Sequence, residues 1–192
     1  MGSVVLGMGM TFDEKGVAET DGPSEEPNTI ELAEKFLQSN PAVASVIKPY
    51  IGGEELNRKP DCAHERFVID FGSLGEDECR SRWPDLMKIV EDKVKPARLR
   101  SNRENYRKYW WQFAERCNSL YEAISGLDFV LAVALTSKTL AFARITSKIV
   151  YANSLLVFPW ASGGALALLQ SRVHEIWARS FGSTMKDDQR YI

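Results

Sequence analysis

The hydrophobic positions of this chain form two patterns, short continuous runs and stripes at helical spacing. Continuous apolar runs of about four to eight residues predict buried strands. We expect such strands at residues 66–72, 129–136, 139–145 and 149–158, and a further, alternating strand at residues 3–10. Short polar turns such as Ser137-Lys138 join the last three runs and predict an antiparallel meander.

Apolar residues that recur every three or four positions predict helices with one buried face. Pro84 opens one such helix, in which Leu86 and Val90 share a face, and Pro96 opens another that we expect over residues 97–113. Shorter helices are predicted at residues 30–38, 42–47 and 118–125, and a long one at residues 162–181. The predicted class is therefore α+β, with a small antiparallel sheet packed with several helices and a long C-terminal helix.

Residues 13–28 are acidic and contain two glycines and two prolines, which predicts a loop. We therefore expect an N-terminal strand and mobile acidic loop over residues 1–28 and a single α+β domain over residues 29–192. The net charge of −2 excludes a uniformly basic nucleic-acid binder, so any such surface must be a local patch. Three separated cysteines and the lack of a secretory signal predict a cytoplasmic protein.

One region of the chain is strongly basic. We name it the basic cluster, and it comprises Lys93, Lys95, Arg98, Arg100 and Arg103. Such a run usually forms a solvated helix face. The functional alternative is contact with nucleic-acid phosphates, with the nearby aromatic residues Tyr106, Trp110 and Trp111 for packing or stacking. The residues by themselves leave both interpretations open.

The polar C-terminal segment offers a second candidate site. Lys186, Asp188, Gln189 and Arg190 follow the predicted long helix. A frayed polar terminus is common. However, lysine and arginine pair with guanine, glutamine with adenine, and aspartate with the cytosine amino group. The segment thus has the side chains needed to read base edges.

Enzyme sites are poorly supported by the residues. Asp70 followed by Glu91 and Lys93 resembles the metal-binding pattern of a Mg²⁺-dependent nuclease. On the predicted helix, however, residues 91 and 93 point about 200° apart, so surface charges are the better explanation. Cys62 and His64 lack a second metal-ligating pair nearby, and His174 has no identifiable catalytic partner.

Several phrases occur in an order and spacing typical of one family. They are Ile47-Lys-Pro-Tyr-Ile-Gly-Gly-Glu-Glu-Leu-Asn57, Arg66-Phe-Val-Ile-Asp-Phe-Gly72, Val90-Glu-Asp-Lys-Val-Lys-Pro96, Tyr106-Arg-Lys-Tyr-Trp-Trp-Gln-Phe113, Leu120-Tyr-Glu-Ala-Ile-Ser-Gly-Leu-Asp128, Leu169-Gln-Ser-Arg-Val-His-Glu-Ile-Trp-Ala-Arg179, Gly182-Ser-Thr-Met-Lys186 and Arg190-Tyr191. Over most of its length the chain resembles the C-terminal target-recognition region of MmeI-like adenine-specific DNA methyltransferases, the bacterial type IIG/IIL restriction–modification enzymes.

The resemblance implies a division of labour between this chain and the rest of a larger enzyme. The family's glycine-rich S-adenosylmethionine motif and its Asn-Pro-Pro-Tyr motif do not occur in this sequence. We therefore expect a catalytic domain elsewhere in the parent chain to bind S-adenosylmethionine and methylate a flipped adenine. The present chain would carry no catalytic residue and no cofactor, and would recognise double-stranded DNA.

The resemblance also indicates which residues contact DNA. Base-reading positions are expected near the end of the domain, at Lys186, Asp188, Gln189 and Arg190, with Trp160 in a second loop. Phosphate contacts are expected from the basic cluster, and phosphate or base contacts from the strand turns at Ser137, Lys138 and Arg144. An alternative function is an interaction scaffold, in which Trp110 and Trp111 dock the methyltransferase domain and the chain alone has little DNA affinity.

Overall fold

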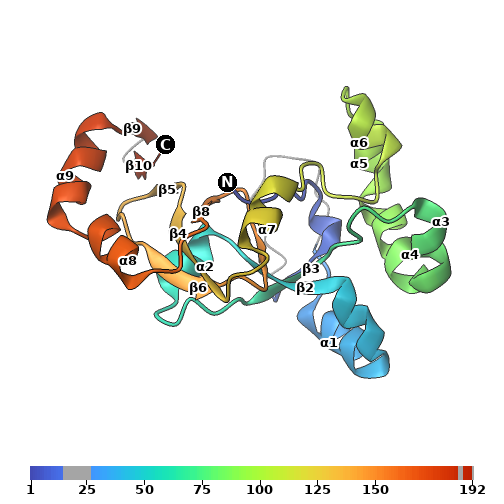
Figure 1. Ribbon diagram of the computed structural model, residues 1–192. Coiled ribbons are helices and arrows are strands. Elements are labelled where there is room, and N and C mark those ends of the chain that lie inside the picture. The colour runs from blue at the N-terminus through green and yellow to red at the C-terminus, as the bar shows by residue number, and fades with distance from the viewer. Residues whose placement is uncertain (15–26, 186–187, 192) are drawn as a thin grey trace. The chain divides into compact units, whose positions relative to one another are not determined.

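The computed structural model describes residues 1–14, 27–185 and 188–191. The chain forms two compact units, each assembled from segments that are distant in sequence (Figure 1). Unit 1 comprises Met1–Ser3, Ile51–His64 and Cys117–Ile192, and unit 2 comprises Val4–Tyr50 and Glu65–Arg116. No helix formed by the described residues is long and apolar enough to cross a membrane.

Unit 1 is built on a central apolar strand. Its helices are α2 (Gly53–Arg58), α7 (Asn118–Ile124), α8 (Gly163–Leu169) and α9 (Arg172–Phe181). Its strands are β4 (Phe129–Ala134), β5 (Thr136–Ser137), β6 (Ala143–Thr146), β7 (Val150–Tyr151), β8 (Leu155–Phe158), β9 (Ser183–Met185) and β10 (Asp188–Arg190). Strand β4 is antiparallel to both β6 and β8 and lies between them. This order differs from the predicted meander, in which β6 would have been central.

Both faces of β4 are buried, which explains its continuous apolar sequence. Val130 and Ala132 pack on one side in a cluster that includes Leu56 of α2 and Ile124 of α7. Leu131 and Val133 pack on the other side with residues of α8, among them Leu166 and Leu169. Side chains alternate between the faces of a strand, so neighbouring residues of β4 enter two different cores.

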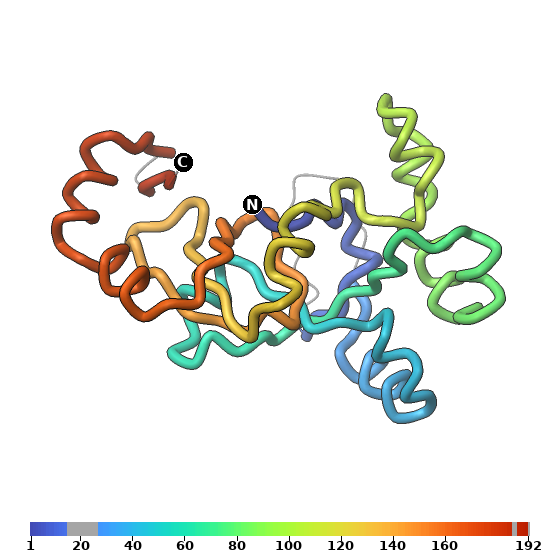
Figure 2. Tube along the Cα trace, in the orientation of Figure 1, coloured from blue at the N-terminus to red at the C-terminus, as the bar shows by residue number. Residues whose placement is uncertain are grey.

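The predicted C-terminal helix is interrupted, and the expectation of one long helix over residues 162–181 is wrong. Figure 2 shows two helical segments with a bend between them, corresponding to α8 and α9. Ser171 adopts an extended conformation, and its hydroxyl accepts a hydrogen bond from the backbone N–H of His174. A serine in this position starts a new helix, because its side chain replaces the carbonyl that the preceding turn would supply.

Unit 2 combines a small antiparallel sheet with short helices. Its elements are η1 (Met8–Met10), β1 (Thr11–Phe12), α1 (Ile30–Ser39), η2 (Pro41–Ser45), β2 (Ile47–Ile51, whose last residue belongs to unit 1), β3 (Arg66–Ile69), α3 (Glu76–Arg82), α4 (Pro84–Lys93), α5 (Lys95–Leu99) and α6 (Glu104–Lys108). Strand β3 lies between β1 and β2 and is antiparallel to both. On α4 the predicted apolar face is buried, with Leu86 and Val90 almost fully enclosed.

Three sequence predictions in unit 2 are wrong for local reasons. Residues 3–10 do not form a strand, since Gly7 has a φ of 131° and a 3₁₀ turn follows. The helix expected at residues 97–113 breaks between α5 and α6, where the Ser101 hydroxyl accepts a hydrogen bond from the Arg103 N–H. The helix expected at residues 42–47 is a 3₁₀ turn that ends before Ile47, which pairs instead with Ile69 of β3. The acidic loop lies mostly outside the described residues.

Candidate nucleic-acid interface

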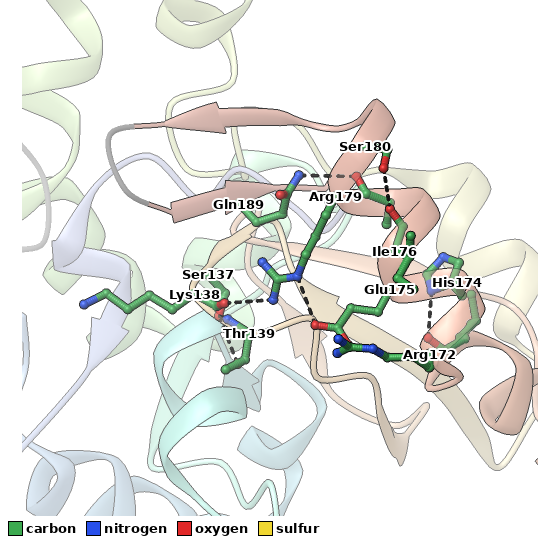
Figure 3. Close-up of polar contacts among 12 residues, drawn as sticks. Ser137, Lys138, Thr139, Arg172, His174, Glu175, Ile176, Arg179, Ser180 and Gln189 are labelled. Atoms are coloured by element: carbon green, nitrogen blue, oxygen red, sulfur yellow. Dashed lines mark hydrogen bonds and ion pairs between the residues drawn. The ribbon is translucent and has the colours of Figure 1, made fainter.

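A three-stranded sheet, here called the C-terminal sheet, joins two groups of residues that lie about 50 positions apart in the sequence. Strand β10 lies between β5 and β9 and is antiparallel to both. Gln189 faces Ser137 on one side and Thr184 on the other. The turn at Ser137-Lys138 and the polar C-terminal segment, predicted separately as DNA contacts, therefore lie side by side (Figure 3).

Gln189 is turned into the protein. Its side-chain amide nitrogen lies 3.1 Å from the Ser183 carbonyl oxygen and 3.5 Å from that of Ala178, and the residue is 7% exposed. Gly182 makes room for it, because a Cβ atom there would lie 2.2 Å from the Gln189 amide nitrogen. In this structure Gln189 anchors β10 to the end of α9. Its predicted base-reading role would require it to leave these contacts.

Asp188 and Arg190 flank this anchor and project to the opposite face of the strand, as alternation requires. Asp188 is half-buried and faces Met185 of β9, while Arg190 is exposed and faces Ser183. Two residues span about 6.6 Å along a strand. A carboxylate and a guanidinium are thus presented on one face, while Lys186 lies outside the described residues.

Arg179 of α9 is a participant that sequence reasoning missed. Its Nε donates to Glu175 over 2.9 Å, and its Nη2 lies 3.4 Å from the carbonyl oxygen of Lys138. Hydrogen bonds from Arg179 and then Arg172 lower the pKa of the Glu175 carboxyl. The spacing of Glu175 and Arg179 is visible in the sequence, but their contact with a turn 41 residues away is not.

The turn beside β5 is shaped by a buried hydroxyl. The Ser137 oxygen accepts hydrogen bonds from the Asn57 amide and the Thr139 N–H, both over 3.2 Å, so it holds the turn and is largely screened from solvent. Lys138 is exposed, and its side chain extends away from Arg179 (Figure 3). Ser137 and Lys138 were both predicted to contact DNA. Of the two, only Lys138 has a polar group that is accessible to a phosphate.

A series of aromatic rings connects the second predicted loop to the C-terminal segment. Trp160 is 49% exposed and packs on Phe158, with ring centroids 5.4 Å apart. Phe158 in turn meets Tyr191 at 6.4 Å, and burial raises the pKa of the Tyr191 hydroxyl. Trp160 and Tyr191, the residue after β10, thus share one cluster. Arg144 lies elsewhere in unit 1, exposed on β6, with its guanidinium 4.2 Å from the Phe129 ring centroid.

In unit 2, Arg98 is enclosed by the protein, so its predicted phosphate contact would require it to leave its present partners. The residue is 2% exposed, and its Nη2 donates to the carbonyl oxygens of Val5 at 2.7 Å and Gln112 at 3.1 Å. A guanidinium enclosed in this way holds two segments of chain together. Sequence gave no signal of its burial, since arginine is rarely buried.

The rest of the basic cluster is at or near the surface, partly in ion pairs. Lys95 contacts Glu91 at 2.5 Å and lies over the buried Trp110 ring, and Arg103 contacts Glu115 at 3.3 Å. Hydrogen bonds from Arg80 and then Lys95 lower the pKa of Glu91 to about 2. Lys93 is half-buried, and Arg100 is exposed. Their phosphate contacts stay predictions.

The nuclease-like residues have other partners. Asp70 pairs with Lys48, and Glu91 pairs with Arg80 and Lys95. Within residues 1–14, 27–185 and 188–191, no three histidine, cysteine, aspartate or glutamate side chains are grouped closely enough to hold a metal ion. Glu91 therefore serves as the centre of a surface ion-pair network.

Comparison with known proteins identifies the class. The family model described as MmeI, target recognition domain, matches residues 28–192, so the chain belongs to this family of recognition domains and not to a catalytic one. The fold is similar to that in the structure of the type IIL restriction–modification enzyme MmeI in complex with DNA. The TM-score is 0.73 at 15% sequence identity, and the match covers 100% of this chain and 23% of that chain. No curated protein matches the chain.

Proposed function

We propose that this chain selects the DNA sequence on which a restriction–modification methyltransferase acts. Family membership supports a recognition role, and the arrangement of the C-terminal sheet carries the proposal. This sheet presents Asp188 and Arg190 on one face, while Gln189 secures the strand from the other. The major groove of DNA admits a two-stranded β-ribbon such as the one that β9 and β10 form within this sheet.

Each of the two displayed side chains has chemistry suited to one base of a G·C pair. The Arg190 guanidinium can donate two hydrogen bonds to the O6 and N7 atoms of guanine, and the Asp188 carboxylate can accept from the N4 amino group of cytosine. Their separation along β10 is about two base-pair steps of B-DNA, each about 3.4 Å. One strand could therefore read two base pairs that are separated by one intervening pair.

Phosphate contacts would supply most of the affinity. Lys138 stands beside the C-terminal sheet, with Arg144 on β6 and Lys93, Lys95, Arg100 and Arg103 in unit 2 as further candidates. Each phosphate that a lysine or arginine neutralises releases counterions, so binding should weaken steeply with salt. Such contacts position the domain on the duplex without choosing a sequence.

Selection from a randomised duplex library at low salt tests the proposal. We expect the chain to retain duplexes enriched in a short motif. Asp188→Ala and Arg190→Ala should relax the motif at one position each, at a cost of about 1–3 kcal/mol per lost base contact. Lys148→Ala is the matched control, because it removes an exposed cation of unit 1 that pairs with Asp128 outside the C-terminal sheet. Equal effects of all three changes would refute the assignment.

We infer that the catalytic steps take place outside this chain. S-adenosylmethionine would bind a methyltransferase domain of the parent enzyme, which would flip and methylate the target adenine. The chain spans less than a quarter of the MmeI chain that it resembles, which leaves room for such a domain. A bacterial cytoplasmic location follows from this proposal. Isothermal titration of the chain with S-adenosylmethionine should give no binding heat.

A second candidate function, docking of the methyltransferase domain, is favoured by one face of α9. Trp110 and Trp111, the pair first expected to dock, are 4% and 7% exposed and belong to the core. By contrast, α9 exposes Val173, Trp177 and Phe181, spaced four residues apart and 57–77% exposed. Trp177→Gln should then weaken binding of the purified methyltransferase domain without altering the selected DNA motif, and unchanged binding would argue against docking.

A further inference from the structure

Unit 2 contains a shallow basic pocket, here called the Asp70 pocket. It has a volume of about 290 Å³, and the residues around it include Lys48, Asp70, Gly72, Arg82, Trp83 and Arg116. It differs from the basic cluster, with which it shares no residue. Nothing in the family description assigns a role to it.

A buried carboxylate organises one side of the pocket. Asp70 is 7% exposed, and one carboxylate oxygen accepts a hydrogen bond from the Gly72 N–H over 3.0 Å. The other oxygen lies 2.9 Å from the Lys48 ammonium, and Arg116 approaches the first at 3.8 Å. Gly72 has a φ of 67°, a conformation that favours glycine and lets the chain turn around the carboxylate. Two cations are thus held at fixed positions.

Arg82 supplies a third cation. Its guanidinium lies 4.3 Å from the ring centroid of Trp83, a buried residue at the start of α4. It also pairs with Glu78 at 2.9 Å, and both side chains are about half exposed. An exposed pair of this kind contributes little. Arg82 can therefore exchange Glu78 for another anion without a large loss of stability.

Cations outnumber acids among the described residues that line the pocket. They are Lys48, Arg82 and Arg116 against Asp70, and Glu78 pairs with Arg82 from outside the lining. Three nearby cations repel one another, and an anion placed among them would relieve that repulsion. Planar guanidinium groups and an ammonium group are the donors that proteins use for phosphate.

We infer that the Asp70 pocket binds a phosphate group, and specifically a phosphodiester of the DNA backbone. The inference rests on the proposed function for the source of the phosphate, but the binding chemistry is independent of it.

Arg82→Gln is the variant of choice, with Arg58→Gln as its matched control. Both arginines are exposed and pair with a glutamate four residues earlier, but only Arg82 lies at the pocket. We would measure affinity for a fixed duplex as a function of salt concentration. Arg82→Gln should reduce the slope of log K against log salt by about 0.9, the effect of one phosphate, and leave the selected motif unchanged. Arg58→Gln should change neither quantity.

A second measurement separates this inference from the proposed function. Inorganic phosphate is titrated into the ¹⁵N-labelled chain, and we expect it to shift the Gly72 amide and Arg82 Nε signals, with the Gly72 response weakened in Arg82→Gln. These shifts would support the site even if the chain retained no duplex. Shifts without a change in salt slope would overturn the DNA backbone as the source and indicate a free phosphate. The absence of both effects would refute the site.

Discussion

The imidazole ring of His174 bridges the start of α9 and the residue after β10. Its Nδ1 lies 2.7 Å from the Leu169 carbonyl oxygen, and its Nε2 lies 3.0 Å from the Tyr191 hydroxyl. A carbonyl oxygen only accepts, so Nδ1 must donate, and in the neutral ring Nε2 then accepts from Tyr191. This connection fixes the end of the C-terminal sheet against the helix that precedes it.

Tyr191→Phe tests that connection. The change retains the ring, which packs against Phe142 and Phe158, but removes the hydroxyl that donates to His174. We expect a loss of about 0.5–1.5 kcal/mol in the free energy of unfolding, measured with urea. Because β10 would be held less firmly, sequence discrimination in the duplex selection should fall more than total affinity. A change in total affinity alone would contradict this.

Arg98→Met should destabilise the protein strongly. It leaves the buried carbonyl oxygen of Val5 and the half-buried one of Gln112 without their donor, and we expect a loss of about 2–5 kcal/mol in urea unfolding. Arg100→Gln, two residues further and exposed, should cost less than about 0.5 kcal/mol but weaken DNA binding at all sequences. If Arg98→Met remained as stable as Arg100→Gln, the buried role would be refuted.

Gln189 and Asp188 are adjacent, yet replacing each by alanine should have different effects on stability and on the selected DNA motif. Gln189→Ala removes the hydrogen bonds to the end of α9 and should lower stability by about 1–2 kcal/mol. Asp188→Ala should leave stability within about 0.5 kcal/mol and alter the selected motif at one position. Urea unfolding and library selection on both variants provide the comparison, and a reversed pattern would show that Gln189 is the reader.

The ion pairs of Glu91 should make the stability of the protein depend on pH in the acid range. Its pKa of about 2 lies below the ordinary glutamate value of 4.5, because Arg80 and then Lys95 stabilise the charged form. A depressed carboxyl pKa contributes stability above the ordinary value, and this contribution is lost as pH falls from about 4.5 to 2. The stability advantage of the wild type over Glu91→Gln should therefore be largest near neutrality and vanish near pH 2. Urea midpoints at pH 7, 4 and 3 measure it, with Asp92→Asn as the control.

Much of the fold could be predicted because the relevant signals are local. The apolar run that forms β4 and the stripe on α4 follow from periodicity. The two helix breaks could not be predicted, because Ser101 and Ser171 each interrupt a helix through a single side-chain hydrogen bond. Serine is also common inside helices, so composition does not reveal which ones will act as caps.

The candidate site was predictable in its chemistry but not in its geometry. The polar inventory of residues 186–190 indicated base reading, whereas the pairing of β10 with β5 depends on residues far apart in sequence. Likewise, Asp70 could be noticed as an isolated acid, but its neighbours Lys48 and Arg116 meet it only in the folded unit. The burial of Gln189 and Arg98 is a property of tertiary packing that residue type argues against.

The alternation along β10 has a consequence for how new variants could arise. Gln189 and Tyr191 hold the strand in place through side-chain hydrogen bonds, whereas among the described residues Asp188 and Arg190 take part through backbone pairing alone. A combinatorial library that randomises positions 188 and 190 and keeps 189 and 191 constant should therefore contain mostly folded members. Variants that prefer a different DNA sequence could then arise from one or two codon substitutions, without compensating mutations in the hydrophobic core.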